Sequence, residues 1–330
     1  MKKIVLLHSD VSPDAGEDEL DCLIQVQTVA GSLAALGLEP LTMPFMMDLN
    51  ATLAGLCAQK PDIVFNLVET VAGKGAMAYF APALLDFLRL PYTGSPTQAM
   101  FLTSNKSLCK KMLYANGIST PAWITADGTI TGGAPQGVYI MKPSWEDASV
   151  GLDEASVLSS VRADTILRAL QNRQEELGME CFAEAYIDGR EFNVALLASG
   201  GDVLVLPPAE ILFVDYPQDK MKILDYRAKW VEGSFEYENT VRNLNLDPHD
   251  AGLVTLLRDT ALQCWRLLGL RGYARVDFRV DQEGRPWVLE INANPCLSPD
   301  AGFAAALDHA GITYNRAIND ILRDAVNFKG

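Results

Sequence analysis

Two strand-like segments near the C-terminus, joined by a short turn, constrain the fold of this chain more than any other feature of its sequence. Residues 273–280 and 285–292 are rich in β-branched, aromatic and aliphatic side chains, and Asp-Gln-Glu-Gly stands between them at 281–284. Aspartate favours a turn because it hydrogen-bonds its own backbone, and glycine because it accepts a positive φ. The pattern predicts an antiparallel β-hairpin.

The polar residues of this hairpin recur at every second position. If the turn closes directly, Asp277 lies opposite Val288 and Arg275 lies opposite Glu290. Because side chains alternate between the two faces of a strand, one face is polar and the other apolar. The polar face carries Arg275, Asp277, Glu290 and Asn292, and the apolar face, which is suited to a core, carries Val276, Phe278, Leu289 and Ile291.

Two carboxylates on one face repel each other unless a cation lies between them. Asp277 and Glu290, with the amide oxygen of Asn292, are hard oxygen ligands of the kind that holds Mg²⁺ together with the phosphates of a nucleotide. The alternative is a solvated face with an Arg/Glu pair that contributes about 0–1 kcal/mol. The segment Asn-Ala-Asn-Pro at 292–295 adds oxygen ligands at the strand end, which favours the metal site.

Two lysines stand where phosphate groups could bind. Lys142 ends a predicted strand at 138–143 and precedes a loop of small residues at 144–151. Such a loop can close over phosphates with its backbone N–H groups, although its spacing is not that of a Walker A motif. Lys106 lies in the first turn of a predicted helix that starts at 103–106. The alternatives are a solvated helix face for Lys106 and a surface hairpin turn for Lys142.

The first third of the chain alternates strand and helix patterns, which favours a parallel α/β domain. We expect strands at 3–8, 61–66 and 90–94 and helices at 19–36 and 76–88. Ligands of such sheets bind beyond the carboxyl ends of the strands. The residues at those ends are His8, Ser9, Asn66 and Glu69.

Clusters of turn residues divide the chain. Candidate boundaries are Gly-Ser-Pro-Thr at 94–97 and the change from helical to strand patterning near 178–183. They predict an N-terminal α/β domain at 1–96, a central domain at 97–183 and a C-terminal domain at 184–330. An NAD-dependent oxidoreductase built on the first domain is a weaker alternative, because no G-x-G-x-x-G follows the first strand.

Charge and hydropathy argue against several classes of partner. The chain has 27 Lys and Arg against 42 Asp and Glu, a net charge of -15, which disfavours nucleic acid and membrane surfaces but allows an anionic nucleotide in a locally basic cleft. The apolar run after Met1 is confined to residues 4–7, so we expect a cytoplasmic protein without a signal peptide or membrane span. The six cysteines are scattered, which favours reduced thiols.

Eight motifs follow one another along nearly the whole chain. They are Leu-Pro-Tyr-Thr-Gly (90–94), Asn-Lys (105–106), Met-Lys-Pro with Asp-Ala-Ser-Val-Gly (141–143 and 147–151), Ala-Glu-Ala-Tyr-Ile-Asp-Gly-Arg-Glu-Phe (183–192), Leu-Pro-Pro-Ala-Glu (206–210), Tyr-Arg-Ala-Lys-Trp (226–230), Arg-Val-Asp (275–277) and Glu-Ile-Asn (290–292). In this order they resemble the ATP-grasp superfamily and, within it, the D-alanine–D-alanine ligases. The resemblance implies an ATP-grasp fold, in which central and C-terminal α+β domains clamp ATP.

The resemblance also implies an activity, cofactors and residue roles. A ligase of this kind uses ATP and two Mg²⁺ ions, or Mn²⁺ in their place, to join a carboxylate to an amine through an acyl phosphate. Amino acids are the expected substrates, and family members are often homodimers. The implied phosphate ligands are Lys106 and Lys142, the adenine and ribose contacts are Glu184, Ala185, Tyr186, Ile187 and Glu191, and the metal ligands are Asp277, Glu290 and Asn292. The implied catalytic groups are Arg275, Lys229 and Ser149, the last in the closing loop.

Several positions depart from the D-alanine pattern. Residues 146–148 are Glu-Asp-Ala where those ligases usually have Glu-Gly-Ser, and Trp230 stands where a tyrosine usually follows the loop lysine. Residues 295–298 are Pro-Cys-Leu-Ser where the family has Pro-Gly-Met-Thr, and Ala-Gly at 301–302 replaces Ser-Leu. Residues 9–21 lack the usual Gly-Gly and His-Glu-Val-Ser motifs, and their nearest acids are Glu17, Asp18 and Glu19. The amino-acid half of the site is therefore altered, and the sequence leaves open D-alanyl-D-alanine, another dipeptide or a different amide. A non-catalytic nucleotide-binding relative is a further alternative, although the lysines and metal ligands are all present.

Overall fold

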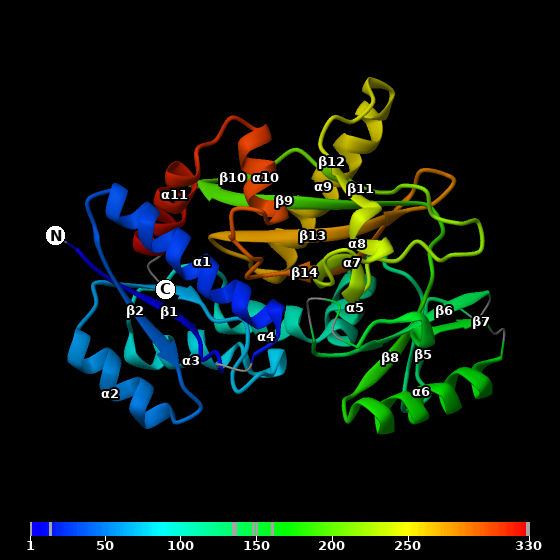
Figure 1. The fold of residues 1–330 in the computed structure, drawn as a ribbon, viewed down its shortest axis with the longest axis horizontal. Coiled ribbons are helices and arrows are strands. Elements are labelled where there is room, and N and C mark those ends of the chain that lie inside the picture. Colours follow the sequence, from blue (N-terminus) through cyan, green and yellow to red (C-terminus); the bar gives the residue numbers. More distant parts are fainter. Residues whose placement is uncertain are drawn as a thin grey trace.

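Three sheets and their helices make up the computed structural model of the protein, which describes residues 2–12, 15–133, 137–146, 149, 151–159 and 162–327. The side chains of residues 17–19, 154 and 327 are outside this description. In Figure 1 the N-terminal sheet and the central sheet lie at opposite ends of the molecule, and the C-terminal sheet extends above and between them.

The N-terminal sheet is parallel and covered on both faces. Its order is β2 (Glu39–Phe45), β1 (Lys3–Ser9) and β3 (Ile63–Leu67). Helix α1 (Glu17–Ala35) packs on one face, and α2 (Leu49–Gln59) and α3 (Phe80–Leu88) pack on the other. Residues 4–7 of β1 have no exposed surface, as expected for a continuous apolar run in a two-sided parallel sheet.

The sequence predicted part of this domain correctly. Strands 3–8 and 61–66 and helix 19–36 are confirmed to within about two residues. The predicted helix 76–88 is two elements, the short 3₁₀ turn η1 (Gly75–Met77) and α3, and the predicted strand 90–94 is only a bridge between Tyr92 and Val64. Strand β2 was not predicted because it contains Pro40 and Pro44, which an edge strand tolerates.

The central sheet is antiparallel, with the order β5 (Ile130–Thr131), β4 (Trp123–Thr125), β8 (Cys181–Ala185), β6 (Val138–Pro143) and β7 (Val157–Ser159), the last preceded by η2 (Glu154–Ser156). Helix α6 (Ala163–Leu177) packs against it through the buried Ile166 and Leu170. Strand β6 confirms the strand predicted at 138–143.

Two helices lead into the central sheet. Helix α4 (Thr97–Ser104) ends where the sequence predicted a helix start, and Asn105 separates it from α5 (Lys106–Ala115). The Asn105 side chain accepts a hydrogen bond from the Leu108 N–H at 2.7 Å, which caps α5. This cap places Lys106 as the first residue of α5.

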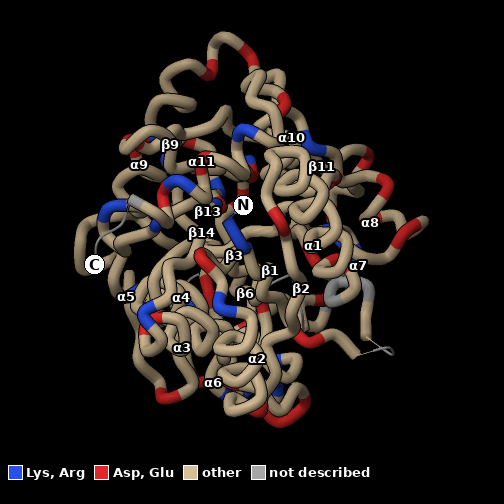
Figure 2. Tube along the Cα trace, turned by 90° about the vertical axis from the view of Figure 1, so that its left-hand side faces the viewer, with Lys and Arg blue, Asp and Glu red and all other residues tan. Residues whose placement is uncertain are grey.

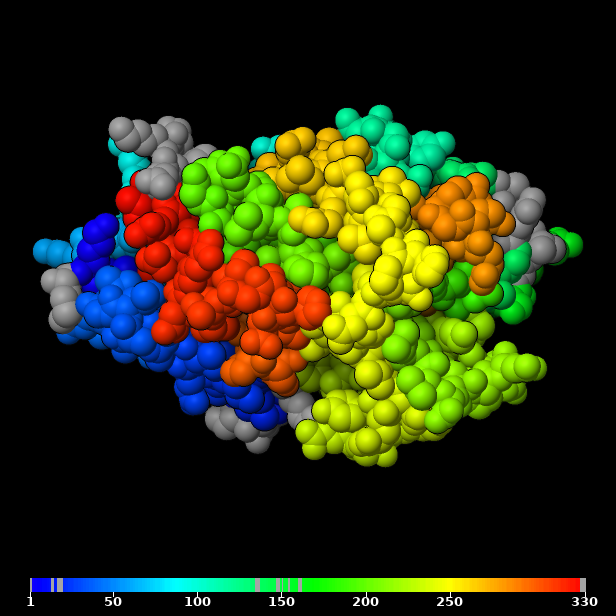
Figure 3. All heavy atoms as spheres, turned by 90° about the horizontal axis from the view of Figure 1, so that it is seen from above, coloured from blue at the N-terminus to red at the C-terminus, as the bar shows by residue number. Residues whose placement is uncertain are grey.

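The C-terminal sheet is antiparallel in every pair, with the order β12 (Thr240–Asn243), β11 (Ala209–Phe213), β9 (Arg190–Ser199), β13 (Tyr273–Val280) and β14 (Pro286–Asn292), while β10 (Asp202–Val205) pairs with β9. The short helices α7 (Tyr226–Trp230) and α8 (Phe235–Glu238) connect β11 to β12. Helices α10 (Gly302–His309) and α11 (Tyr314–Asn327) follow β14, and Figure 3 shows this C-terminal segment lying against the N-terminal segment.

Helix α9 (Ala251–Leu268), which follows η3 (Pro248–Asp250), packs its apolar side chains against this sheet. Leu257, Ala261, Cys264 and Leu268 recur at helical spacing and are buried against the strands. Gly269 ends the helix in the left-handed conformation.

The C-terminal hairpin is present, but its predicted register is wrong. Asp277 pairs with Glu290 and Arg275 pairs with Asn292, because the register shifts between Asp277 and Phe278. The bulge leaves Leu289 without a paired partner, and this residue lines a cleft instead of joining the core, contrary to prediction. The other predicted apolar residues, Val276, Phe278 and Ile291, are buried.

The predicted domain division stays a prediction. Residue 183 lies inside β8, whose pairing partners all belong to the central sheet. Figure 2 shows basic and acidic residues interspersed along the described trace. Across the described residues, every helix is too short or too polar to cross a membrane.

We predict that Gly272→Ala destabilises the fold more than Gly269→Ala. Both glycines have positive φ, +66° and +63°, but a Cβ on Gly272 would lie 2.9 Å from the Gly94 backbone nitrogen, whereas Gly269 faces open space. Strain alone gives Gly269→Ala a loss of about 1 kcal/mol, and overpacking brings Gly272→Ala to roughly 3 kcal/mol. Urea unfolding followed by tryptophan fluorescence measures both, and equal losses would contradict the close approach.

Candidate active site

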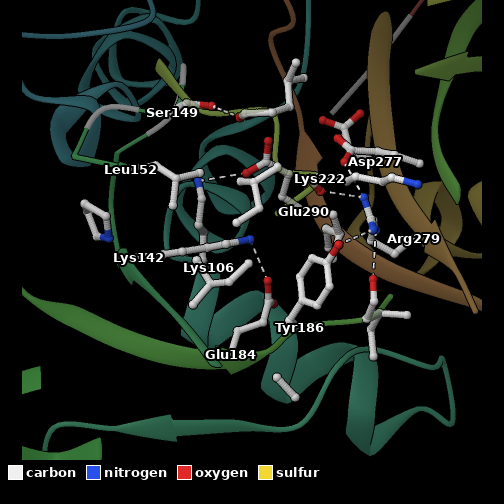
Figure 4. Close-up of a pocket in the computed structure, with 18 of the residues that line it drawn as sticks. Lys106, Lys142, Ser149, Leu152, Glu184, Tyr186, Lys222, Asp277, Arg279 and Glu290 are labelled. Carbon is white, nitrogen blue, oxygen red and sulfur yellow. Dashed lines mark hydrogen bonds and ion pairs between the residues drawn. The ribbon is translucent and has the colours of Figure 1, made fainter. Parts of the chain in front are cut away.

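A cleft between the central and C-terminal sheets gathers most of the predicted site residues (Figure 4). It contains about 780 Å³ of space not filled by atoms, part of which is open to solvent. All predicted site residues except Arg275 and Asn292 line it. These two lie at its edge, where Arg275 and Asn292 both donate hydrogen bonds to Asp277.

Lys106 is buried, so its interpretation as a solvated helix residue is wrong. As the first residue of α5 it reaches the C-terminal hairpin, where its Nζ lies 3.1 Å from Oε2 of Glu290. The same Nζ donates to the Glu146 carbonyl at 2.7 Å, at the base of the loop that follows β6. Lys106 thus ties the central domain to both the hairpin and the loop.

Lys142, near the end of β6, forms an ion pair with Glu184 of the neighbouring β8, with 2.5 Å between Nζ and Oε1. The second oxygen of Glu184 pairs with Lys110 at 2.7 Å. Burial alone would raise the pKa of Glu184, but Lys110 and Lys142 outweigh burial and hold the pKa below its usual value. The carboxylate is therefore ionised although it is almost fully buried.

The last residue of β8 and the two residues after it line one end of the cleft. These residues are Ala185, Tyr186 and Ile187, and Arg279 of β13 fixes them by donating to the Ile187 carbonyl and the Tyr186 hydroxyl, both at 3.0 Å. Arg279 also lies 3.1 Å from Glu191, whose pKa is raised by burial in spite of this cation.

The carboxylates of the hairpin face the cleft together. Asp277 accepts a bidentate pair of hydrogen bonds from Arg275, at 2.7 and 2.8 Å, and another from Asn193 at 2.8 Å. Burial alone would raise the pKa of Glu290, but Lys106 and the neighbouring Lys229 and Lys142 hold it well below its usual value. Two carboxylates from paired strand positions that line one cleft suit a hard cation.

Lys229 and Ser149 approach the cleft from two different segments of the chain. Helix α7 carries Lys229 and is capped by Asp225, which accepts from the Ala228 N–H at 2.9 Å. Burial lowers the pKa of Lys229, with Glu290 opposing the shift. Ser149, which has a φ of +64°, donates to the Leu224 carbonyl at 2.8 Å and so joins the two segments. Residues 147, 148 and 150 of the predicted closing loop lie outside the described chain.

Known proteins are similar to this chain in both sequence and fold. Residues 137–323, more than half of the chain, match the family described as D-ala D-ala ligase C-terminus. The chain belongs to the D-alanine–D-alanine ligase family. A D-alanine–D-alanine ligase of Gloeobacter violaceus is 31% identical over 330 residues, which cover 97% of this chain and 98% of that protein. The uncharacterised protein y4sG of Sinorhizobium fredii is 32% identical over 266 residues, covering 80% of this chain and 75% of that protein.

Solved structures confirm the ATP-grasp fold of the family. The D-alanine–D-alanine ligase from Bacillus anthracis complexed with ATP superimposes with a TM-score of 0.71 and 20% identity, covering 99% of this chain and 98% of that one. The D-alanyl-alanine synthetase A from Vibrio cholerae gives a TM-score of 0.73 and 16% identity, covering 99% of both chains. Both chains are covered almost completely, so the predicted fold class is confirmed from end to end.

The donor set of the hairpin fits Mg²⁺. Within the described part of the chain no group of three His, Cys, Asp or Glu side chains could hold a metal ion. Asp277 and Glu290 instead supply two carboxylates from directly paired positions, with Asn292 two residues further along β14. A pair of carboxylates completed by other oxygen ligands suits Mg²⁺, which retains waters and phosphate oxygens in its coordination shell.

Three residues that contact the predicted site were missed. Arg279 continues the alternation of Arg275 and Asp277 along β13, so the period of two could have identified it. Lys110 follows Lys106 by one helical turn, but nothing in the sequence shows that Glu184 meets it. Asn193 lies opposite Asp277 only because β9 pairs with β13.

We predict that Asp277→Asn and Glu290→Gln each reduce Mg-ATP turnover by about a hundredfold or more, because each removes a charge that holds Mg²⁺. Both substitutions keep the side-chain shape, so we expect far-UV circular dichroism and the melting temperature to stay close to those of the parent protein. Glu283→Gln, an exposed acid in the turn of the same hairpin, is the matched control and should leave turnover unchanged. Near-normal turnover by both site variants at moderate magnesium would rule out these ligands.

Proposed function

We propose that this protein is an ATP-dependent ligase that joins a carboxylate to an amine through an acyl phosphate. The observation that carries the proposal is the meeting of two lysines, Lys106 and Lys142, with two carboxylates, Asp277 and Glu290, across one cleft. A carboxylate is a poor electrophile, and transfer of the γ-phosphoryl group of ATP makes it one that an amine can attack. Positioning and charge stabilisation are sufficient for such a transfer.

The cations of the cleft would lower the negative charge that develops on the phosphoryl group. In this proposal Lys106 and Lys142 bind the nucleotide phosphates, and Lys229 reaches the terminal phosphate from α7. Arg275 is held by its bidentate pair with Asp277 and presents a fixed guanidinium to the acyl phosphate. Mg²⁺ held by Asp277, Glu290 and Asn292 would supply further charge neutralisation at the phosphates.

The end of the cleft beside β8 would hold the nucleoside. We assign adenine to Ala185, Tyr186 and Ile187, with Glu184 at the entrance of this segment, and the ribose hydroxyls to Glu191. Arg279 supports the assignment, because its hydrogen bonds to Tyr186 and Ile187 keep this segment in place before a ligand arrives. Ser149 would act in the closing loop, whose closure keeps water away from the acyl phosphate.

The amino-acid half of the site would lie where α1 meets the segment after β14. Asp21 of α1 accepts hydrogen bonds from Cys296 at 2.9 Å and from Ser298 at 2.7 Å. Gln25, one turn later, donates to Glu69 at 2.7 Å. Ser298 has no exposed surface, so its hydroxyl is committed to Asp21 and does not replace the hydroxyl that the D-alanine pattern places near position 301.

Arg242 changes the shape and charge at that position. Its guanidinium lies 3.6 Å from the place that a Cβ on Gly302 would take, and its Nη1 donates to the Asp300 carbonyl at 3.2 Å. The space beside Gly302 thus borders a cation on β12 in place of a small hydroxyl group. We infer that the acceptor differs from D-alanine in the placement of its anionic group or in its size.

A coupled assay of ADP release tests the proposed function. Purified protein with Mg-ATP should release ADP and phosphate only when both a carboxylate and an amine are present, across a panel of D- and L-amino acids and small carboxylates. Mass spectrometry should find the matching amide. Nucleotide binding without turnover for any pair in a broad panel would instead favour the non-catalytic relative.

We predict that D-alanine alone supports ATP turnover far below that of the best pair in this panel. Loss of one hydrogen-bond donor to a buried carboxylate weakens binding by about 1–3 kcal/mol, or roughly tenfold to more than a hundredfold. Steady-state kinetics at submillimolar D-alanine make the comparison. Robust D-alanyl-D-alanine synthesis there would show that the changes at Cys296, Ala301 and Gly302 are neutral.

A further inference from the structure

Lys110 is a buried lysine beside the nucleotide cleft to which neither the motifs nor the proposed mechanism gives a role. It lies on α5, one turn after Lys106, and only 1% of its side chain is exposed. Its Nζ donates to Glu184 Oε2 at 2.7 Å and to Thr120 Oγ1 at 2.6 Å, and it lies 5.4 Å from the ring centre of Trp123. A lysine is rarely buried so completely unless its charge is paired.

Glu184 is shared between this lysine and Lys142. One carboxylate oxygen meets Lys110 and the other meets Lys142, so the cluster contains two ammonium groups and one carboxylate. The cluster therefore carries a net positive charge. Lys142, whose side chain is 17% exposed, is the member that presents this charge to the cleft. With Lys142 as its only partner, Glu184 would neutralise that ammonium group and compete with a phosphate for it.

We propose that Lys110 is a positioning residue for nucleotide phosphates, acting through Glu184 on Lys142. By binding one oxygen of Glu184, Lys110 fixes the carboxylate and keeps part of the charge of Lys142 available to an anionic ligand. This inference rests on the proposed function, because it takes the anionic ligand to be a nucleotide.

A second chain of contacts connects Lys110 to the hairpin. Thr120, which accepts from Lys110, donates to the Val288 carbonyl at 2.8 Å, and the Val288 N–H donates to Ser119 at 2.8 Å. Val288 lies in β14, two residues before Glu290, which pairs with Lys106 at the start of α5. Helix α5 thus carries Lys106, which lines the cleft, and Lys110, which binds Glu184 behind it.

The experiment compares a ligand that has phosphates with one that lacks them. The affinities of ADP and adenosine are measured in Mg²⁺ by competition against a fluorescent ATP analogue, and the readout is the ratio of the two dissociation constants. Lys110→Met should weaken ADP binding by about tenfold or more while changing adenosine binding by less than about twofold, because the lost interaction is with phosphate charge.

Lys111→Met is the matched control, because it is the next residue of α5 and its side chain is exposed. It should leave both affinities unchanged. A purely structural role for Lys110 predicts instead that Lys110→Met weakens ADP and adenosine equally, and that result would overturn the inference. An unchanged ratio in a folded Lys110→Met variant would overturn it as well.

Glu184→Gln extends the test, because Lys110→Met leaves a buried carboxylate with one fewer cation and can prevent folding. If Lys110 acts through the charge of Glu184, then adding Lys110→Met to Glu184→Gln changes the ratio by less than about twofold, because the two side chains are in contact and their effects are not additive. A further tenfold drop in the double variant would overturn the inference. Failure of the parent protein to prefer ADP over adenosine would contradict the proposed function itself, which is a separate outcome.

Discussion

The sharing of carboxylates between cations is the interaction on which the cleft depends. Glu184 is buried and Glu290 is partly buried, and each is ionised because lysines lie beside it. Removing the lysine partners of Glu184 would leave a buried anion without a cation, which is strongly destabilising. The cleft is therefore assembled as a set of charges in which each group is positioned by the others, before any ligand is bound.

This set of charges brings parts of the chain together that are remote in sequence. Lys106 joins the start of α5 to β14, and Arg279 joins β13 to the segment after β8. Two sheets form the cleft: the central sheet and the helix that leads into it contribute Lys142 and Lys106, and the C-terminal hairpin contributes the carboxylates of Asp277 and Glu290. The antiparallel hairpin is stiff enough to hold two acids in direct register, with the bulge at Leu289 adjusting which residues face the cleft.

The two halves of the proposed site differ in how closely they follow the family. The proposed nucleotide half brings the lysines, both hairpin carboxylates and the linker segment into one cleft. In the proposed amino-acid half, Asp21 binds both Cys296 and Ser298, and Arg242 borders Gly302. This contrast is physically reasonable, since phosphoryl transfer from ATP places the same demands on every such ligase, whereas the pocket for the acceptor must follow the acceptor's shape and charge.

The sequence by itself determined the fold class, the hairpin and most of the predicted residues that line the cleft. Alternation along residues 273–280 places Asp277 on a polar face in any register, because the period of a strand is local. Tertiary structure decided which residues meet. The bulge that pairs Asp277 with Glu290, the burial of Lys106, and the partnership of Lys110 with Glu184 all depend on contacts between segments distant in the chain. Periodicity contains no information about such contacts, because they arise from how whole sheets and helices pack against each other.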